Sequence, residues 1–406
     1  METSSPLRHS TYLRRETSTK RSAETFSGTS NRRRIVVVER RLTHYRVPFY
    51  NRLRALLASE GIELQLLIGT GTEDEARKQD LARLDWAIPI PTFHFFGQRV
   101  CWQPFGAYAR QADLVIVNHE NKMLYNLWLL FFRRPKRLAF WGHGRNMQSQ
   151  SPGGLKERFK RWTVAKADWW FAYTDMSTEL VEIAGFPRRA ITVVENAADT
   201  REMTELCEKI RPQDLQSLRQ RWQLDRGPVG IYIGSFYPEK RIDFLLAAAH
   251  KIRQKIPGFQ LVIAGAGLPQ EQEWIDRAVQ ANPWVHYVGP LYGTDKAAGL
   301  MLADVLLNPG AVGLGIQDSF VSGTPMLTTD CGLHGPEISY LRSGVNGVMT
   351  ATDLDTYADS VAEVLSVSET LARLRDGSLE SAPRYTIENM AERFHQGVLA
   401  CLEDIC

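Results

Sequence analysis

Short runs of β-branched and apolar residues alternate with helix-like segments along most of this chain. Strands that are buried on both faces of a parallel sheet show this pattern, and parallel strands require a crossover that is usually a helix. The alternation therefore predicts an α/β fold with helices on both faces of the sheet. In the first half of the chain the runs lie at residues 35–38, 64–68, 114–117, 138–141, 171–173 and 191–194.

A second alternating series follows a polar segment, residues 199–225, that has a helical composition and contains no strand-like run. Its apolar runs lie at residues 229–233, 261–264, 285–288 and 305–307. The chain has 406 residues, a length that two cores serve better than one. Two doubly wound domains are therefore expected, and ligands bind at the carboxyl ends of the strands in such sheets.

The pattern also predicts where the domains begin and end. Residues 1–33 are rich in Ser, Thr and Arg with few large apolar residues, so we expect a disordered basic tail. An N-terminal Rossmann-like domain is expected over residues 34–200 and a C-terminal one over residues 201–386. Residues 387–406 are expected to form a C-terminal helix that packs back toward the N-terminal domain.

The composition excludes several classes of protein. The five cysteines form no Cys-x-x-Cys pair, which argues against a disulfide framework and against structural zinc and fits a reducing cytoplasm. The N-terminus lacks the apolar core of a signal peptide. The longest strongly apolar stretch, residues 127–132, is far shorter than the roughly 20 residues of a membrane span. A cytoplasmic location is expected.

Positive charge is concentrated in the first half of the chain. The formal charge is +5 over residues 1–34, +6 over residues 35–200 and −8 over residues 201–406. The basic half would face an anionic partner such as a membrane, a lipid-linked phosphate or a polyanion. The alternative is that these charges are spread over solvated surfaces. Nucleic acid is not expected as a partner, because no nucleic-acid-binding module is recognisable.

One segment of this basic half combines both features of a membrane-docking surface. Residues 124–132 are apolar and aromatic, and residues 133–137 are strongly basic. This pattern is typical of an interfacial helix on anionic lipid, which would place the protein peripherally on the inner face of the plasma membrane. A core helix with a basic end is an equally good interpretation. Trp169, Trp170 and the basic segment 156–166 would extend the same surface.

In the second half, glycines and cations follow the predicted strands. The stretch 231–241 reads as strand, loop and helix start, and it carries Lys240 and Arg241. Backbone N–H groups at a helix start and a neighbouring cation both attract phosphate. Gly265 and Gly267 follow the next strand, where glycine permits a tight turn and a close approach of the backbone.

The most informative stretch is the glycine-rich segment 308–325, which leads into a short helix starting near Gly315. We expect the free N–H groups of Gly313, Leu314, Gly315 and Ile316 to face an anion. Asp318 lies one turn into this helix. A carboxylate beside a diphosphate would be repelled, so Asp318 is expected to accept hydrogen bonds from ribose hydroxyls. The alternative is that it only complements the positive end of the helix.

Taken together, residues 228–350 resemble the donor domain of family 4 retaining glycosyltransferases of the GT-B fold. The motifs occur in the order of that family: a Gly-x-x-x-Pro-Glu-Lys loop, an apolar-Gly-x-Gly turn, Tyr-x-Gly-Pro, an Ala-Asp strand, the glycine-rich loop with its acid, Gly-Thr-Pro, and Pro-Glu-Ile at 336–338. The first half is similar too, with Trp-Gly-His-Gly at 141–144, Ala-Asp at 167–168 and Glu-Asn-Ala-Ala-Asp at 195–199.

The resemblance implies two Rossmann-like domains facing a central cleft. It also implies transfer of a sugar from a nucleotide diphosphate to an acceptor hydroxyl, with retention at the anomeric carbon and without a metal or other cofactor. The acceptor would be a glycan or a lipid-linked glycan, in polysaccharide or glycolipid assembly. It would bind in the N-terminal domain.

The resemblance further implies roles for individual residues. Lys240, Asp318 and His143 would form the catalytic set: Lys240 stabilises the leaving diphosphate, Asp318 holds the ribose and His143 orients the sugar. For His143 and His119 the alternative is a purely structural histidine. The remaining donor-side residues would be Gly234, Ser235, Arg241, Gly265, Gly267, Leu291, Gly313, Leu314, Gly315 and Ile316. The acceptor-side candidates are His44, Tyr45, Arg46 and His119.

Several positions depart from the family pattern. The family has two glutamates eight positions apart, and here these positions are Gly310 and Asp318. Ser235 replaces the usual arginine, and Arg241 replaces a glycine. The family's Gly-Gly loop is replaced by residues 40–46, and the Pro-Gly-x-Val-Gly-Leu variant resembles a polysaccharide-assembly subset. We interpret these changes as altered recognition. Two alternatives remain: a non-catalytic nucleotide-sugar-binding subunit of a glycan assembly complex, or a sugar-nucleotide epimerase.

Overall fold

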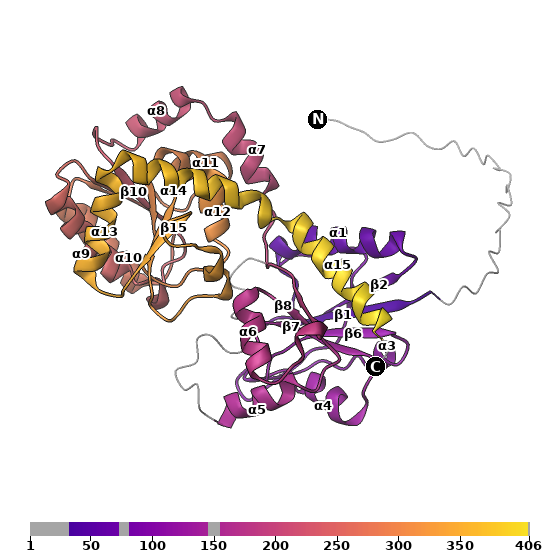
Figure 1. Cartoon of the computed structure of the whole chain (residues 1–406). Coiled ribbons are helices and arrows are strands. Elements are labelled where there is room, and N and C mark those ends of the chain that lie inside the picture. Colours follow the sequence, from indigo (N-terminus) through magenta and orange to yellow (C-terminus); the bar gives the residue numbers. More distant parts are fainter. Residues whose placement is uncertain (1–31, 73–80, 145–154, 405–406) are drawn as a thin grey trace, which may run out of the picture. The chain divides into compact units, whose positions relative to one another are not determined.

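The computed structural model describes residues 32–72, 81–144 and 155–404 (Figure 1). From Arg33 onward the described residues belong to one unit. The expected disordered tail, residues 1–33, lies outside the described residues except for Arg32 and Arg33. No helix in the described ranges is long and apolar enough to cross a membrane.

The first half of the chain forms a seven-stranded sheet in the order β3-β2-β1-β6-β7-β8-β9, and every pair in it is parallel. The strands are β1 Arg34–Glu39, β2 Glu63–Ile68, β3 Ile88–Pro89, β6 Leu114–Asn118, β7 Leu138–Gly142, β8 Trp169–Ala172 and β9 Ile191–Val193. The central strand β1 is buried on both faces, since Ile35, Val36, Val37 and Val38 are almost fully inaccessible. This burial explains why its sequence is continuously apolar.

Helices connect these strands. They are α1 Val47–Ser59, α3 Gly106–Ala109, α4 Leu124–Phe132, α5 Leu155–Val164 and α6 Asp175–Ile183, with single helical turns η1 His44–Arg46 and η2 Arg188–Ala190. A small antiparallel pair, β4 Phe93–Phe95 and β5 Val100–Trp102, precedes α3. Pro48 lies in the first turn of α1, where its missing N–H costs nothing.

The second sheet has six parallel strands in the order β12-β11-β10-β13-β14-β15. Its strands are β10 Val229–Ile233, β11 Gln260–Ala264, β12 Val285–Tyr287, β13 Val305–Leu307, β14 Met326–Thr329 and β15 Gly347–Thr350. Successive side chains point to opposite faces, so Ile231 and Val262 join one hydrophobic cluster and Tyr232 and Ile263 join another. Each face of this sheet therefore has its own core.

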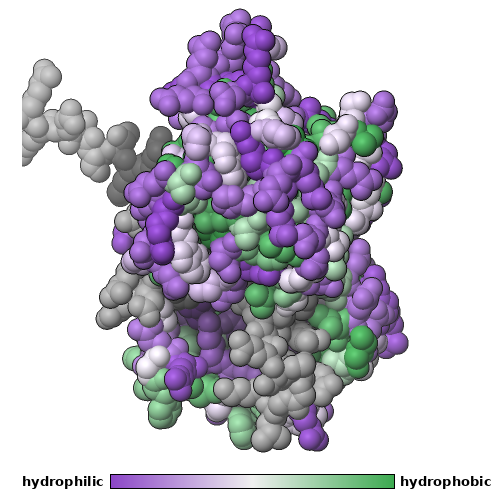
Figure 2. Space-filling model, turned by 90° about the vertical axis from the view of Figure 1, so that its left-hand side faces the viewer, coloured by the Kyte–Doolittle hydropathy of each residue, from purple (hydrophilic) through white to green (hydrophobic). Residues whose placement is uncertain are grey.

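The helices of the second half supply the other side of these two cores. They are α7 Arg201–Lys209, α8 Pro212–Arg221, α9 Ile242–Lys255, α10 Pro269–Ala281, α11 Gly293–Leu302, α12 Ile316–Ser322, α13 Leu354–Ser366 and α14 Ser368–Ser381, with turns η3 Pro238–Lys240, η4 Pro336–Tyr340 and η5 Ala382–Arg384. The sequence did not predict β14, β15, α13 or α14. The face of the molecule in Figure 2 is largely hydrophilic, as expected for a surface in water.

The last helix, α15 Ile387–Glu403, packs its apolar face into the core of the first sheet (Figure 1). Its Phe394 ring stacks on Phe171 of β8 with 4.1 Å between the ring centroids. Thr386 caps the helix by accepting a hydrogen bond from the N–H of Asn389. A segment far away in sequence thus completes the hydrophobic core around β1, β7 and β8.

Candidate functional site

Three loops meet at the carboxyl edge of the second sheet. Strand β10 lies between β11 and β13, so the loops that follow these three strands are neighbours. The strand order also reverses direction between β10 and β13, and such a switch point is where ligands bind in doubly wound sheets. The residues that the sequence singled out on the donor side lie mainly on these loops, at residues 234–241, 265–267 and 310–318.

The first two loops are in direct backbone contact, and this contact requires their glycines. Gly265 has φ +144°, and a side chain there would overlap the carbonyl oxygen of Gly234. A side chain at Gly267 would overlap the carbonyl oxygen of Phe236. Ser235 lies exposed between them, and its carbonyl oxygen accepts a hydrogen bond from the Tyr232 hydroxyl at 3.0 Å. These glycines therefore shape the edge of the sheet whatever ligand it receives.

Lys240 is held against the glycine-rich loop. It is half-buried at the end of η3, and its ammonium group donates a hydrogen bond to the carbonyl oxygen of Ala311. The N–H of Ala311 in turn donates to the carbonyl oxygen of Glu239 at 2.8 Å. Burial lowers the pKa of Lys240 to about 8, because the charged form loses hydration there. The cation and the loop thus form one small unit.

This close packing explains the missing acid at position 310. A side chain at Gly310 would overlap the carbonyl oxygens of Glu239 and Lys240. Since both carbonyls belong to the backbone, no rotamer change could remove the overlap. In this chain the position that the family resemblance assigns to a glutamate is filled by the backbone of the Lys240 turn.

The glycine-rich loop itself has fewer free donors than the sequence predicted. The N–H of Ile316 donates to the carbonyl oxygen of Gly313 at 3.2 Å, so the expectation for Ile316 was wrong: the chain tightens into a turn just before α12. Within the described part of the chain, no group accepts from the N–H groups of Gly313, Leu314 and Gly315. Three donors remain for an anion. A side chain at Gly313 or Gly315 would meet no atom.

Asp318 lies in the first turn of α12 and is paired with a cation. Its Oδ2 atom lies 2.8 Å from Nζ of Lys296 on α11, and both side chains are only partly exposed. The ion pair fixes the carboxylate at the end of the glycine-rich loop. Leu291, the remaining donor-side candidate, lies before α11 and packs near Gly299 of that helix.

Arg241 adopts a backbone conformation that favours glycine. Its φ is +54° and its ψ is +51°, in the left-handed region. The resemblance places a glycine at this position, and the structure supplies the physical reason. The guanidinium lies over the Phe244 ring, 4.2 Å from the centroid, and Nη1 donates to Thr329 Oγ1 at 3.4 Å. The cation is therefore turned toward β14.

No sequence motif pointed to His334, which is buried behind the glycine-rich loop. The N–H of Val312 donates to His334 Nδ1 at 3.1 Å, and Nε2 donates to the carbonyl oxygen of Thr329 at 2.7 Å. This pair of bonds requires the neutral ring. Burial lowers the pKa of His334, which favours that form. His334 therefore fixes the loop from behind.

The first sheet has a polar cavity of about 170 Å³ at its own switch point, between β1 and β6. Glu39 lies in it at the end of β1, and it accepts hydrogen bonds from the Tyr50 hydroxyl at 2.5 Å and from Asn118 Nδ2 at 2.7 Å. Burial raises the pKa of Glu39. Tyr45 and Arg46 also line this cavity, whereas His44 is exposed at the start of η1 and is not among the lining residues.

Arg46 is buried and committed to a chain of polar contacts. Its Nη2 donates to Asn196 Oδ1 at 2.6 Å, and Asn196 Nδ2 donates to Glu337 Oε1 at 2.5 Å. Its guanidinium also lies 5.0 Å from the Trp141 ring centroid. Arg46 thus connects the first loop of the chain with the Pro-Glu-Ile motif through the segment that follows β9.

The two histidines that follow strands of the first sheet differ in their surroundings. His143 is exposed after β7, and its ring lies edge-on to Tyr173 at 4.4 Å between centroids. His119 is buried between Phe140 and Trp170, and its Nε2 lies 2.9 Å from Thr163 Oγ1. The structure contradicts an acceptor-side role for His119: the chain turns inward after β6, so the ring joins the core.

Metal binding has no obvious site in the described residues. No group of three or more His, Cys, Asp or Glu side chains in residues 32–72, 81–144 and 155–404 is arranged to hold a metal ion.

Comparison with known proteins finds a family match over the segment that contains the three loops described above. Residues 227–367 match the family described as "Glycosyl transferases group 1", and this segment contains Lys240, Gly310 and Asp318. The match begins just before β10 and ends after α13, so it includes all six strands of the second sheet.

Curated relatives match this chain over part of their length. The chain is 27% identical to a glycogen synthase of Mycobacterium tuberculosis over 46% of this chain and 43% of the relative. It is 25% identical to a D-inositol 3-phosphate glycosyltransferase of Nocardia farcinica over 59% of this chain and 54% of the relative. The chain thus spans about half the length of the curated relatives it matches.

Solved structures show the same fold over nearly the whole chain. The HepE protein of Anabaena, solved in complex with UDP and glucose, superposes with a TM-score of 0.62 over 90% of this chain and 99% of that chain, at 16% identity. The fold is therefore the two-domain α/β arrangement of GT-B glycosyltransferases, with a parallel sheet in each domain.

Proposed function

We propose that this protein is a glycosyltransferase that moves a sugar from a nucleotide diphosphate donor to an acceptor hydroxyl. The observation that carries the proposal is Lys240 held on the glycine-rich loop, within the segment that matches the glycosyl transferases group 1 family. A cation beside unpaired backbone N–H groups, at the switch point of a parallel sheet, suits a diphosphate. We place the reaction in polysaccharide or glycolipid assembly.

The leaving group is the step that these residues serve best. As the bond from the anomeric carbon to the diphosphate breaks, negative charge grows on the phosphate oxygens. Lys240 and the N–H groups of Gly313, Leu314 and Gly315 would stabilise that charge, and no metal ion would be needed. In our proposal Arg241 adds positive charge at the same edge. Gly234, Ser235, Gly265 and Gly267 shape this edge of the donor site, and Leu291 borders it.

The proposed stereochemical outcome is retention. The acceptor hydroxyl would attack on the face from which the diphosphate leaves, and the departing diphosphate would take the hydroxyl proton. This path needs no enzyme nucleophile, which suits the glycine at position 310. Asp318, oriented by Lys296, would accept hydrogen bonds from the ribose hydroxyls. His143 would orient the sugar, and the acceptor would lie on the side of the first sheet near His44, Tyr45 and Arg46.

The decisive experiment compares Lys240→Ala with a matched lysine variant. Lys251 lies on α9 and pairs with Asp355 at the surface, so Lys251→Ala removes a lysine away from the site. UDP-, GDP- and TDP-sugars would be offered with and without acceptor extracts, and hydrolysis and transfer would be followed by mass spectrometry. We expect turnover with one donor class, a loss of about 100-fold or more in Lys240→Ala, and full activity in Lys251→Ala.

The other outcomes separate the alternatives. Retained turnover in Lys240→Ala would refute the leaving-group role. Binding of a nucleotide sugar without hydrolysis or transfer would instead support a non-catalytic donor-binding subunit of a glycan assembly complex. Release of a free sugar with inverted configuration at a ring carbon would support a sugar-nucleotide epimerase.

We also propose that the protein is cytoplasmic and attaches peripherally to the inner face of the plasma membrane. One face of α4 packs into the first core through Leu129 and Leu130, whereas Phe131 and Phe132 are exposed. Phe131 stacks on the exposed Trp162 of α5 at 5.3 Å between centroids. We name Phe131, Phe132, Phe159 and Trp162 the aromatic surface.

Exposed cations border the aromatic surface. Arg133 follows α4 directly, Arg158 lies on α5, and Nζ of Lys166 lies 5.4 Å from the Trp162 ring centroid. Aromatic side chains beside cations suit the headgroup region of an anionic membrane. Trp169 and Trp170 do not extend this surface, contrary to the expectation from sequence, because both are buried in β8.

A further inference from the structure

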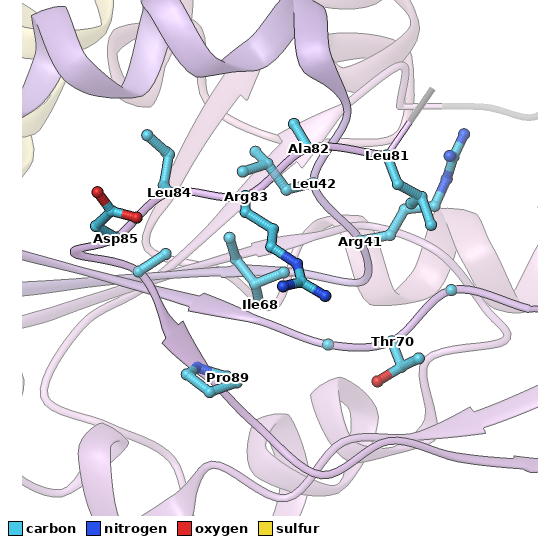
Figure 3. A pocket seen from close by; sticks show the side chains of 13 residues that line it. Arg41, Leu42, Ile68, Thr70, Leu81, Ala82, Arg83, Leu84, Asp85 and Pro89 are labelled. Carbon is cyan, nitrogen blue, oxygen red and sulfur yellow. The ribbon is translucent and has the colours of Figure 1, made fainter. Parts of the chain in front are cut away.

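A second cavity lies at the open edge of the first sheet, beyond the carboxyl end of β2. Its volume is about 800 Å³, which is large enough for a sizeable organic ligand. Two loops and one extended segment form its walls (Figure 3): residues 41–42 after β1, residues 68–71 at the end of β2, and residues 81–89 leading into β3. None of the residues discussed for the donor lies here.

Most of the lining is apolar. Figure 3 shows Leu42, Ile68 and Ala82 around the middle of the cavity, Leu84 beside Asp85 at one end and Leu81 near the other end. Leu42 is already buried in the core, whereas Ile68, Ala82 and Leu84 are only partly buried. Leu81 is largely exposed to solvent, although its side chain is one that usually packs in a core. Apolar side chains that line an open cavity gain free energy when a ligand removes them from water. The wall therefore suits a hydrocarbon chain.

A cation projects into this apolar lining. The guanidinium of Arg83 points toward Ile68 and Thr70 (Figure 3), and within the described residues no carboxylate pairs with it. Arg41 also lines the cavity on the side of Leu81, and its guanidinium points away from Arg83 (Figure 3). Asp85, the acid among the lining residues, lies at the opposite end from Arg41. The cavity thus offers positive charge next to hydrocarbon.

The cavity borders the polar site at the end of β1. Arg41 and Leu42 line both this cavity and the smaller one that contains Glu39. A ligand in the large cavity would therefore lie beside the loop that follows the central strand. The described lining contains no aromatic ring, so a nucleotide base would find no stacking partner here.

We propose that this cavity binds the acceptor, and that the acceptor is an amphiphilic anion. Its hydrocarbon chain lies against Ile68, Leu84 and their neighbours, and its phosphate-type group pairs with Arg83. The role of this ligand as acceptor rests on the proposed glycosyl transfer, whereas its binding to the cavity does not. Its test is therefore a binding measurement that requires no turnover.

The experiment is isothermal titration calorimetry on the full chain with three probes: octyl phosphate below its critical micelle concentration, octanol and inorganic phosphate. We expect octyl phosphate to bind at least about tenfold more tightly than either of the other two. In Arg83→Gln, which removes the charge and keeps the length, octyl phosphate should weaken about tenfold or more while octanol is unchanged. Arg52→Gln, an exposed arginine variant on α1, should bind like the native chain.

A second variant tests the apolar wall. Leu84→Gln should weaken octyl phosphate and octanol alike, and circular dichroism checks that each variant is folded. Equal binding of inorganic phosphate and octyl phosphate would show a site for free phosphate, and it would refute the proposal that the ligand is amphiphilic. Native-like binding of octyl phosphate to both Arg83→Gln and Leu84→Gln, or no binding to the native chain, would overturn the site.

The proposed function can fail separately. If octyl phosphate binds as expected but no nucleotide sugar is turned over, the cavity proposal stands and the transferase proposal falls. If a nucleotide sugar is hydrolysed but octyl phosphate does not bind, the reverse holds.

Discussion

The ammonium group of Lys240 donates a hydrogen bond to the backbone carbonyl oxygen of Ala311. Lys240 is the principal cation that we assign to the diphosphate. The hydrogen bond holds it on the loop whose N–H groups would face the same ligand. Because this lysine is partly buried, its charge is sensitive to pH.

We expect kcat/KM for the donor to fall as the pH rises through about 8. The pKa of Lys240 is lowered to about 8 by burial, so the charged form is present below this pH and lost above it. The unfolded chain still binds this proton up to about 10.5, so the same shift should make the free energy of unfolding rise between pH 8 and 10.5. In Lys240→Arg, any residual activity should not decline near pH 8. An unchanged pH profile in that variant would show that another group titrates.

Restoring the acid at position 310 should damage the protein. A side chain at Gly310 overlaps the carbonyl oxygens of Glu239 and Lys240, so Gly310→Ala and Gly310→Glu should each lower the free energy of unfolding by about 1–3 kcal/mol. Donor turnover should fall as well, since the Lys240 turn must move. Gly313→Ala is the control, because open space surrounds that position and its stability should change little. Urea denaturation measures all three, and higher activity in Gly310→Glu would contradict the packing argument.

Replacing Arg241 should separate backbone strain from charge. A left-handed conformation costs a residue with a side chain roughly 1 kcal/mol. Arg241→Gly should therefore keep or raise the melting temperature, although the variant loses the guanidinium contact with the Phe244 ring. If the guanidinium assists donor binding, KM for the donor should rise in Arg241→Gly and Arg241→Asn alike, because asparagine also tolerates this conformation. An unchanged KM in both variants would remove Arg241 from the donor site.

Sedimentation with liposomes tests the aromatic surface. Phe132 is 74% exposed at the end of α4, and Phe132→Ser should reduce binding to vesicles that contain phosphatidylglycerol. Tyr292 is 79% exposed before α11, so Tyr292→Ser is a matched loss of an exposed ring and should have no effect. Neutral phosphatidylcholine vesicles should bind the native chain weakly. Equal loss in both variants, or no binding to either vesicle, would refute membrane docking.

The alternation of buried strands and helices predicted six of the seven strands of the first sheet and four of the six strands of the second, because strands buried on both faces must be continuously apolar. The same reasoning missed α13 and α14. Position after a strand was a less reliable predictor of whether a side chain reaches the site. His119 and His143 both follow strands, yet His119 is buried in the core and His143 is exposed to solvent. Position after a strand does not determine which way the backbone turns next.

The site could be predicted only where glycines and charges lie close together in sequence. Lys240, Gly313 and Asp318 carried such a signal. His334 did not, because its partners Val312 and Thr329 meet it only in the folded chain. The sequence likewise did not indicate a site at Arg83, because a lone arginine between apolar residues looks like an ordinary surface residue until the cavity around it is known.

The packing of α15 against β8 has a consequence for synthesis of the protein. During translation the strands of the first sheet are complete long before Phe394 and the rest of α15 leave the ribosome. Until then, part of the first core lacks its cover, whereas the second sheet already has every strand and most of its helices. The part of the molecule that is made first should therefore be the last to finish folding.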